Sequence, residues 1–408
     1  MKYIYADYLV LCDEKFTIIN DGAIAFDKTI KFVGSKDELQ AKYENINLEY
    51  MGENSIIMPG LINSHIHLEF SANKTTLKYG DFIKWLFSVI ENREQLITKA
   101  TTKLIKNEIT KMVQNGTTTI GAISSYGLDL EAIKTSQINT VYFTEVLGSK
   151  PDMIDTLFLD FKEKLKKAIS YKNDKFIPAI AIHSPYSTHP FLIREVLKIA
   201  QKEDMSVSAH FLESKAENEW LNSSSGDFVP FFKNILNQTK SLTTPQNFLE
   251  QFKEIKNLSF THCVEASEEE LNLIKDLKAS VIHCPNSNRI LTNSKLDLDR
   301  LDNINLAIGT DGLSSNYTLN LFEELKNALF VHTAQDMEKL AQKLILASTL
   351  GGAKALGLTK KGSLKVGYDS DIISFKLKDK PTQDIATHII LNSYTPHYVF
   401  IGGENELS

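Results

Sequence analysis

The sequence predicts an α/β protein: a (β/α)8 barrel of the TIM type with a small β-sandwich formed from both chain termini. Short apolar runs alternate with helix-compatible stretches through the middle of the 408-residue chain, and β-rich segments stand at both of its ends. Eight such βα units over about 300 residues are typical of a closed barrel and not of an open sheet. We expect the sandwich domain in residues 1–56 and 360–408 and the barrel domain in residues 57–359.

The terminal segments carry the alternation of apolar and polar residues that is typical of strands exposed on one face. In the first segment such runs lie at residues 3–12, 16–26 and 29–33. In the last segment, residues 362–375 predict two short strands with turns, and residues 399–403 predict another. Because these segments bracket the long middle part, one sandwich built from both is the simplest arrangement.

The middle of the chain supplies the eight βα units. The predicted barrel strands are residues 56–63, 117–123, 140–147, 176–183, 206–211, 258–263, 279–284 and 305–310. Helix-compatible stretches separate them, with examples at residues 95–114, 155–170, 190–203 and 267–277. The sequence contains neither a G-x-G-x-x-G nor a G-x-x-x-x-G-K-[S/T] motif, so a glycine loop that binds nucleotide phosphates is unsupported.

The composition excludes several classes of protein. The net charge of −6 and the pI of about 6.0 leave no basic excess for binding nucleic acid or a membrane surface. Three scattered cysteines are too few for a disulfide framework and indicate a reducing compartment. The N-terminus lacks the apolar core of a signal peptide, and no run reaches the roughly 18 apolar residues of a membrane-spanning helix. We therefore expect a cytoplasmic protein without nucleic-acid or membrane partners.

Residues suited to metal binding or acid–base chemistry follow six of the predicted barrel strands. The first strand ends in a histidine pair, His65 and His67, and residues i and i+2 of a strand point to the same face. The C-terminal ends of the strands meet at one mouth of a (β/α)8 barrel, so we expect these side chains to converge. The residues at the other strand ends are His183, His210 with Glu213, His262, the segment 283–288, and Asp311.

Each of these residues also has a structural interpretation. A single histidine is more often a hydrogen-bonded core residue than a ligand, and an Asp before Gly is usually a turn residue. That interpretation would have to hold independently at six strand ends. Since imidazole and carboxylate groups are common zinc ligands, the pattern instead predicts a metal site. Its predicted ligands are His65, His67, His210 and Asp311.

This pattern resembles the amidohydrolase superfamily, which has H-x-H on the first strand, His on the fifth and sixth, and Asp on the eighth. The H-x-x-E spacing of His210 and Glu213 resembles its cytosine/adenosine-deaminase-like branch. Further matches to that branch are residues 59–65, 283–288, 309–311 and 362–375. That branch also has a sandwich made from both termini, so the resemblance covers essentially the whole chain. It implies a metal-dependent aminohydrolase that cleaves a C–N bond of a cyclic amidine.

The resemblance also bears on the number of metal ions. Binuclear members of the superfamily use a carbamylated Lys at the end of the fourth strand. Residues 176–183 contain no Lys, and Lys175 precedes the strand. We predict one divalent metal, zinc, with a water molecule in the open position, and iron or manganese as alternatives.

The resemblance implies roles for the three catalytic residues. A water molecule attacks the amine-bearing carbon of an aromatic ring, and Asp311 and His262 take up its proton. Glu213 protonates the adjacent ring nitrogen and then helps the ammonia to leave. The structural alternative for Glu213 is a surface carboxylate after a strand, which the H-x-x-E spacing disfavours.

The segment after the first strand bears on the substrate. Residues 81–94 resemble an element of the S-adenosylhomocysteine and methylthioadenosine deaminases, in which the Glu matching Glu94 holds ribose hydroxyls. His183 resembles their purine-contacting His, and Trp85 either packs on the base or belongs to the core. Residues 65–74 and 85–94 together most resemble the aminofutalosine deaminases. The resemblance therefore implies the substrate 6-amino-6-deoxyfutalosine, which is hydrolysed to futalosine and ammonia on a route to menaquinone.

That adenine nucleoside carries a carboxyphenyl ketone on its 5′ side. Arg93 and Arg289 are candidates for binding the carboxylate, and either can equally be a surface residue. Four residues at the ends of the second and third strands are candidates for lining the pocket: Ser124, Ser125, Tyr126 and Glu145.

Other functions remain open at this stage. One is a deaminase of S-adenosylhomocysteine, methylthioadenosine or adenosine. Another is a different amidohydrolase, such as a guanine deaminase, a chlorohydrolase or an enzyme acting on an imidazolone. The last is a non-catalytic barrel or scaffold subunit, which the presence of every ligand and of the acid disfavours. The branch often forms dimers, so a homodimer is an open expectation.

Overall fold

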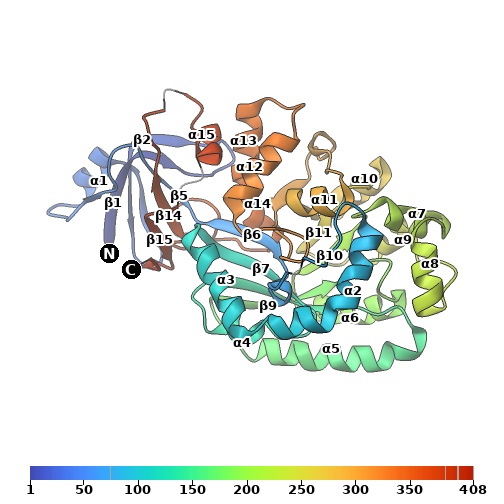
Figure 1. Ribbon diagram of the computed structural model, residues 1–408. Coiled ribbons are helices and arrows are strands. Elements are labelled where there is room, and N and C mark those ends of the chain that lie inside the picture. Colours follow the sequence, from blue (N-terminus) through green and yellow to red (C-terminus); the bar gives the residue numbers. More distant parts are fainter. Residues whose placement is uncertain (74, 382, 393–394, 408) are drawn as a thin grey trace.

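The computed structural model describes residues 1–73, 75–381, 383–392 and 395–407, and these residues form two eight-stranded sheets. Figure 1 shows one sheet at the left, where the two ends of the chain lie side by side, and the other sheet at the right among most of the helices. Five residues that fall in ranges interpreted from the sequence lie outside the described residues: Lys74, Thr382, Ser393, Tyr394 and Ser408.

The terminal sheet is mixed and draws its strands from both ends of the chain. They are β1 (Lys2–Val10), β2 (Ile18–Phe26), β3 (Ile30–Ser35), β4 (Glu49–Tyr50), β5 (Ser55–Pro59), β14 (Ile372–Lys376), β15 (Tyr398–Ile401) and β16 (Glu404–Asn405). The hydrogen-bonded order is β16-β15-β14-β5-β1-β2-β3, with β4 beside β1. Strand β5 joins the two ends, because it pairs in parallel with β1 and antiparallel with β14.

The second sheet is the predicted barrel. Its strands are β6 (Leu61–Ile66), β7 (Thr117–Ser124), β8 (Asn139–Val146), β9 (Phe176–Ile182), β10 (Val207–Phe211), β11 (Leu258–His262), β12 (Ser280–His283) and β13 (Asn305–Ile308). All neighbours are parallel and follow one another in chain order. The backbone N–H groups of Thr310 and Asp311 donate to His65 O, at 3.1 and 3.0 Å, and so bring the last strand back to the first. The prediction of a TIM-type barrel is confirmed.

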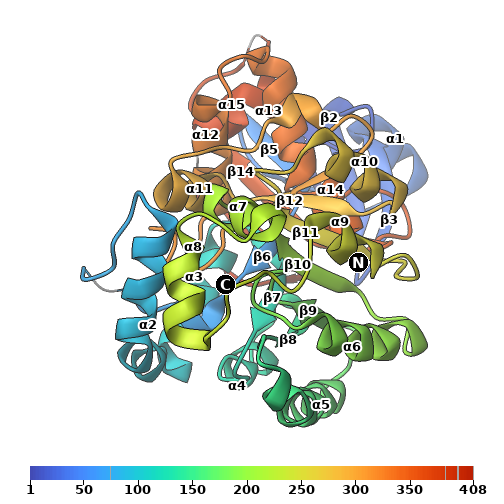
Figure 2. The ribbon, with the colours of Figure 1, turned by 90° about the vertical axis from the view of Figure 1, so that its right-hand side faces the viewer.

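Helices surround the barrel strands, as Figure 2 shows. The helices that connect the strands up to β10 are α2 (Phe82–Lys99), α3 (Thr102–Gln114), α4 (Leu130–Lys134), α5 (Ile154–Ile169) and α6 (Pro190–Lys202). Those that follow it are α7 (Lys215–Ser223), α8 (Phe228–Phe231), α9 (Pro245–Glu250), α10 (Glu268–Asp276), α11 (Pro285–Thr292), α12 (Leu321–Val331), α13 (Met337–Ala347) and α14 (Leu350–Ala355). Helix α1 (Lys36–Lys42) lies on the terminal sheet, and α15 (Ile385–Leu391) packs against α12 and α13.

Shorter helical turns complete the connections. They are the 3-10 turns η1 (Leu68–Phe70), η2 (Pro151–Met153) and η4 (Leu298–Arg300), and the π-helical turn η3 (Phe232–Leu236).

The main core lies between the barrel strands and the helices. Strands β7 and β8 are buried along their whole length, as expected for a parallel sheet that is covered by helices. Helix α6 illustrates the covering layer: its buried residues Leu192, Val196 and Ala200 recur every fourth position and form one apolar face. Pro190 begins this helix, where its missing N–H leaves no hydrogen bond unmade.

The first predicted barrel strand, residues 56–63, is two strands. Strand β5 belongs to the terminal sheet and β6 to the barrel, and Gly60 stands between them. Gly60 N donates to Asp371 O at 2.9 Å, and a Cβ at this position would lie 2.2 Å from the side chain of Thr118. Only glycine fits this close approach of two chain segments. The prediction of one strand was wrong. The apolar run is uninterrupted, and such a run does not indicate that its two halves join different sheets.

Two other predicted elements differ from the structure. The helix predicted at residues 95–114 is the end of α2 followed by α3, because Thr101 Oγ1 accepts from Leu104 N at 3.2 Å and starts a new helix. The two strands predicted at residues 362–375 are reduced to β14. The residues before it form turns, and Leu364 N donates to Leu11 O at 2.9 Å.

Within the described residues, no helix combines the length and the apolar character needed to cross a membrane. The three cysteines are all buried with free thiols.

Candidate active site

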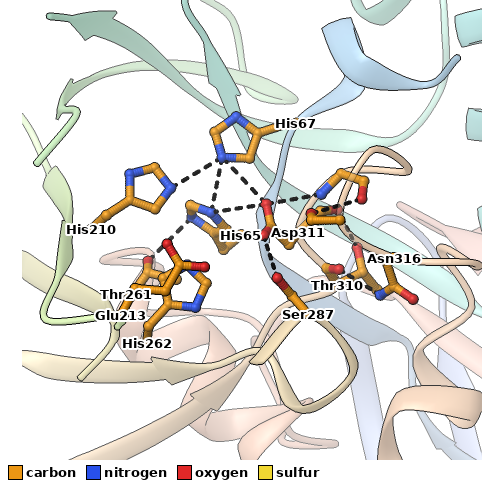
Figure 3. A network of polar contacts seen from close by, with 12 residues as sticks. His65, His67, His210, Glu213, Thr261, His262, Ser287, Thr310, Asp311 and Asn316 are labelled. Carbon is orange, nitrogen blue, oxygen red and sulfur yellow. Dashed lines mark hydrogen bonds and ion pairs between the residues drawn. The ribbon is translucent and has the colours of Figure 1, made fainter. Parts of the chain in front are cut away.

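Four side chains from three strand ends meet at the barrel mouth, as Figure 3 shows. The Nε2 atom of His67 lies 3.1 Å from that of His65 and 3.2 Å from that of His210. Asp311 Oδ1 lies 3.5 Å from His67 Nε2 and 3.8 Å from His65 Nε2. The structure therefore brings together all four residues that the sequence predicts as metal ligands.

Hydrogen bonds behind the histidines aim their Nε2 atoms at this point. His210 Nδ1 lies 2.7 Å from His183 O, and a carbonyl oxygen can only accept, so the proton of His210 sits on Nδ1 and Nε2 presents a lone pair. His65 Nδ1 lies 3.2 Å from the Thr261 hydroxyl. Lone pairs that face one another repel unless a cation lies between them. The donor set thus fits a divalent metal ion, with the outer hydrogen bonds that orient ligand histidines.

Asp311 is held in place by its backbone and by its neighbours. It has φ +60°, a left-handed conformation that is uncommon outside glycine. Ser287 Oγ donates to its Oδ2 at 2.7 Å, and Gly312 N donates to its Oδ1 at 2.9 Å. Gly309 leaves room for the site, because a Cβ there would lie 2.7 Å from His65 Cβ.

Glu213 and His262 face each other beside this cluster. Glu213 Oε1 lies 3.5 Å from His262 Nε2, and neither atom makes a hydrogen bond with a described residue although both are buried. On its other side, His262 Nδ1 lies 2.8 Å from Asn288 Oδ1. Buried polar atoms are rarely left without partners, so these two atoms point to a ligand or water that the protein is built to receive.

Burial sets the protonation states of the site. It lowers the pKa of His67 to about 3 and that of His262 to about 4, so both imidazoles are neutral near pH 7. Burial, together with the charges of Asp311 and Glu217, raises the pKa of Glu213 well above its ordinary value. This direction favours the protonated acid, which suits a general acid.

The cluster forms one wall of a cavity whose other walls are largely apolar. The lining residues are His67, Phe70, Phe82, Trp85, Leu86, Val89, His183, Tyr186, His210, Glu213, His262, Asp311, Ser314 and Ser315. Trp85 Nε1 donates to Ser314 O at 2.8 Å, which fixes the indole against the loop that follows β13. The structure thus brings the predicted substrate-binding residues Trp85 and His183 into the same cavity as the predicted catalytic residues.

Other predicted site residues lie elsewhere. Glu94 and Arg93 are exposed on α2 and, among the described residues, do not belong to the cavity lining. The Arg93 guanidinium instead lies over the ring of Tyr126, 4.9 Å from its centre. Arg289 is exposed and lines a separate depression beside the mouth. Ser124, Ser125 and Glu145 are buried in hydrogen-bonded positions behind the strand ends.

Sequence reasoning gave no role to three residues that the structure places behind the site. Ser287 and Asn288 hold Asp311 and His262, and Thr261 contacts His65. Ser287 and Asn288 belong to the segment 283–288, whose resemblance was noted without a function for either side chain. Their partners come from other strands, so spacing along the chain could not have revealed them.

The sequence also matches a known family model. The model, described as "Amidohydrolase family", matches residues 56–405. The chain belongs to the amidohydrolase family. This confirms the resemblance drawn from the strand-end residues, and with it the interpretation of this amidohydrolase as a metal-dependent hydrolase acting on C–N bonds.

Curated relatives and solved structures agree with this assignment. The amidohydrolase is 46% identical over 393 residues, 96% of each chain, to the aminodeoxyfutalosine deaminase of a Nitratiruptor species. It is 34% identical to a protein of Helicobacter pylori named adenosine deaminase, with 99% of each chain covered. It also resembles the crystal structure of H. pylori aminofutalosine deaminase in complex with methylthio-coformycin, with a TM-score of 0.94, 32% identity, and 99% and 100% of the two chains covered.

Proposed function

We propose that this amidohydrolase converts 6-amino-6-deoxyfutalosine to futalosine and ammonia, a step in menaquinone biosynthesis. The observation that carries the proposal is the position of Glu213, whose pKa burial raises, and of His262 beside the predicted ligand cluster, in a cavity that Trp85 and His183 also line. An acid next to a water-activating centre is what the hydrolysis of an aromatic amine requires. The likeness to the deaminase of Nitratiruptor supports the choice of substrate.

We infer one divalent metal ion per chain, and zinc as its identity. His65, His67, His210 and Asp311 would hold it. When bound, the metal supplies Lewis-acid activation of water at neutral pH. Strand β9 contributes no lysine for a second, bridged metal.

The side chains divide the proton transfers between them. Water adds to the amine-bearing carbon of the adenine ring, and Asp311 and His262 accept its proton. Glu213 donates its proton to the adjacent ring nitrogen, which removes the aromaticity and leaves a tetrahedral carbon. The bond between that carbon and the amino group then breaks, and the proton taken up from water leaves with the ammonia. The remaining hydroxyl proton on that carbon passes to the Glu213 carboxylate, which leaves the carbonyl of the product and restores the acid.

The cavity walls hold the nucleoside. His183 Nδ1 lies 2.6 Å from Ser187 Oγ and is thereby oriented, so its other ring nitrogen is available to contact the purine. Phe82, Trp85 and Tyr186 supply apolar surface for the base.

A panel of adenine nucleosides that differ at the 5′ position tests the proposal. The loss of absorbance at the adenine band is followed for 6-amino-6-deoxyfutalosine, methylthioadenosine, S-adenosylhomocysteine and adenosine. We expect the highest kcat/KM for the first. A preference for adenosine would favour the second candidate, which the H. pylori relative supports. Activity on guanine or a triazine alone would overturn both.

Metal analysis completes the test. We expect one equivalent of metal per chain, loss of activity on chelation, and full recovery with one equivalent of zinc. Recovery with iron or manganese but not zinc would change the identity of the metal, and two equivalents would contradict the single site.

A further inference from the structure

Side chains of the segment His283–Asn288 belong to a chain of polar contacts that ends at His332, a residue outside the cavity lining of the described residues. His262 Nδ1 lies 2.8 Å from Asn288 Oδ1. Asn288 Nδ2 lies 3.5 Å from His283 Nδ1, and His283 Nε2 lies 3.0 Å from His332 Nε2. The chain therefore runs from the catalytic pair of Glu213 and His262 through Asn288 and His283 to His332.

Each member of the chain comes from a different place in the fold. His262 ends β11, His283 ends β12, and Asn288 lies in the first turns of α11. His332 follows the last residue of α12, where its N–H donates to Ala328 O at 3.1 Å. All four side chains are at least 95% buried, so few water molecules compete for these contacts.

The asparagine fixes the direction of every hydrogen bond in the chain. Its Oδ1 can only accept, so His262 carries its proton on Nδ1 and leaves Nε2 bare toward Glu213. Its Nδ2 can only donate, so His283 accepts on Nδ1 and carries its proton on Nε2. That proton is donated to His332, which accepts on Nε2.

We propose that Asn288, backed by His283 and His332, is a positioning group that locks His262 in the Nδ1–H tautomer. His262 then presents an unprotonated Nε2 to the reacting water. The catalytic role of His262 in this inference rests on the proposed deaminase function. The tautomer of His262 does not, because it is a property of the protein alone. The second nitrogen of a histidine commonly sets the role of the first in this way.

Histidine side-chain NMR tests the tautomer directly. The protein is labelled with 15N in its histidine rings, loaded with zinc, and studied by long-range 1H–15N correlation, with His262 assigned by the loss of its signals in a His262→Asn variant. We expect the Nδ1–H pattern for His262 in the wild type and its loss in Asn288→Leu. An Nε2–H pattern in the wild type, or an unchanged pattern in Asn288→Leu, would overturn the proposal.

Kinetics provide the second readout. Partners of this kind change activity by about 10- to 100-fold, so Asn288→Leu is expected to lower kcat by that factor with KM and zinc content unchanged. A parallel loss of zinc or a rise in KM would instead show a merely structural role and contradict the proposal.

The remote end of the chain offers a matched pair of variants. His332→Gln keeps an acceptor for the His283 proton, whereas His332→Leu removes it at similar volume. We expect wild-type kcat for His332→Gln and a several-fold lower kcat for His332→Leu, with the same KM in both. Equal kcat values would overturn the role of His332 and His283. If Asn288→Leu does not fold, the wild-type NMR pattern still tests the tautomer of His262, and this pair tests its support by His283 and His332.

The deaminase activity and the tautomer of His262 can be tested separately. If the protein deaminates none of the adenine nucleosides, the proposed function falls, but the NMR experiment still reports whether Asn288 sets the tautomer of His262. If the nucleosides are deaminated and His262 is the Nε2–H tautomer, only the positioning role is lost.

Discussion

The polar residues beyond the end of β7 and those of the cluster at the ends of β6, β10, β11 and β13 are similar in type but are used in opposite ways. Beyond β7, the carboxylate of Glu69 accepts from the backbone N–H groups of Ser125, Tyr126 and Leu128 at 2.7–3.1 Å. Asp129 Oδ1 accepts from Ser124 Oγ at 2.7 Å and from Tyr142 OH at 2.9 Å. Both oxygens of Glu69 and one oxygen of Asp129 thus have partners, whereas Asp129 Oδ2 is buried without one; neither acid belongs to the cavity lining of the described residues.

In the cluster at the ends of β6, β10, β11 and β13, polar atoms are left facing the cavity. Glu213 Oε1 and His262 Nε2 make no hydrogen bond with a described residue, and the three Nε2 atoms of the ligand histidines face one another. A buried carboxylic acid at a strand end therefore says little about function by itself. What distinguishes the proposed catalytic half from the structural half is that its unpartnered atoms belong to residues that line the cavity, whereas Asp129, which also has an unpartnered oxygen, does not line it.

Replacing the buried acids Glu213 and Glu69 by glutamine should show the difference between the two halves most clearly. Glu213→Gln removes the proton donor, so we expect kcat to fall by about a thousandfold while the metal content stays at one equivalent. Glu69→Gln should keep kcat near the wild-type value and lower the free energy of unfolding by about 2 kcal/mol, because an amide cannot accept all the N–H groups that the carboxylate does. Steady-state kinetics and denaturant unfolding measure both. A near-normal kcat in Glu213→Gln would remove Glu213 from the mechanism.

Two serines that each donate to an aspartate at 2.7 Å give a matched test of the same difference. Ser287→Ala removes the hydrogen bond to Asp311 Oδ2, and we expect kcat to fall by about tenfold or more with little change in stability. Ser124→Ala removes one hydrogen bond to Asp129 Oδ1, and kcat should stay within twofold of the wild type. Equal losses of kcat in both variants would mean that the two halves are not separate.

The sequence predicted the catalytic half better than the structural half for a physical reason. Metal-binding histidines and a general acid must be particular residue types at the ends of particular strands, so His65 and His67 stand out together with the residues at the other strand ends, and Glu213 stands out through the family resemblance of its H-x-x-E spacing. Partners such as Ser287 and Asn288 are ordinary hydrogen-bonding residues, and their roles depend on strands that are distant in the sequence. The same limit applies to the fold, since alternation located the barrel strands, but the division at Gly60 depends on contacts with Thr118 and Asp371.

The pH dependence of stability should also come from the structural half. Burial, together with the charge of Glu69, raises the pKa of Asp129 to about 8, above the 3.8 of an ordinary Asp. The folded protein therefore holds a proton at Asp129 that the unfolded chain releases between these two pH values. The stabilisation from this proton is full below pH 3.8 and is lost as the pH rises to about 8. Asp129→Asn imitates the protonated group, so we expect its unfolding temperature to fall less than that of the wild type between pH 5 and 8. Parallel curves for the two proteins would show that Asp129 is ionised when folded.

The smallest effect is expected for a substitution on α2, and it is an effect on KM. Trp85 faces the cavity and is bonded to Ser314, whereas Glu94 is exposed about two turns further along the same helix. Exposed substitutions away from specific contacts change free energies by only a few tenths of a kcal/mol, so Glu94→Gln should change KM by less than about threefold. Trp85→Ala, which opens the cavity wall, should raise KM several-fold. A tenfold rise in KM for Glu94→Gln at unchanged kcat would show that Glu94 binds the ribose as the sequence predicts. In that case α2 would have to move toward the mouth when the nucleoside binds, because only a change of position can bring an exposed carboxylate to the ligand.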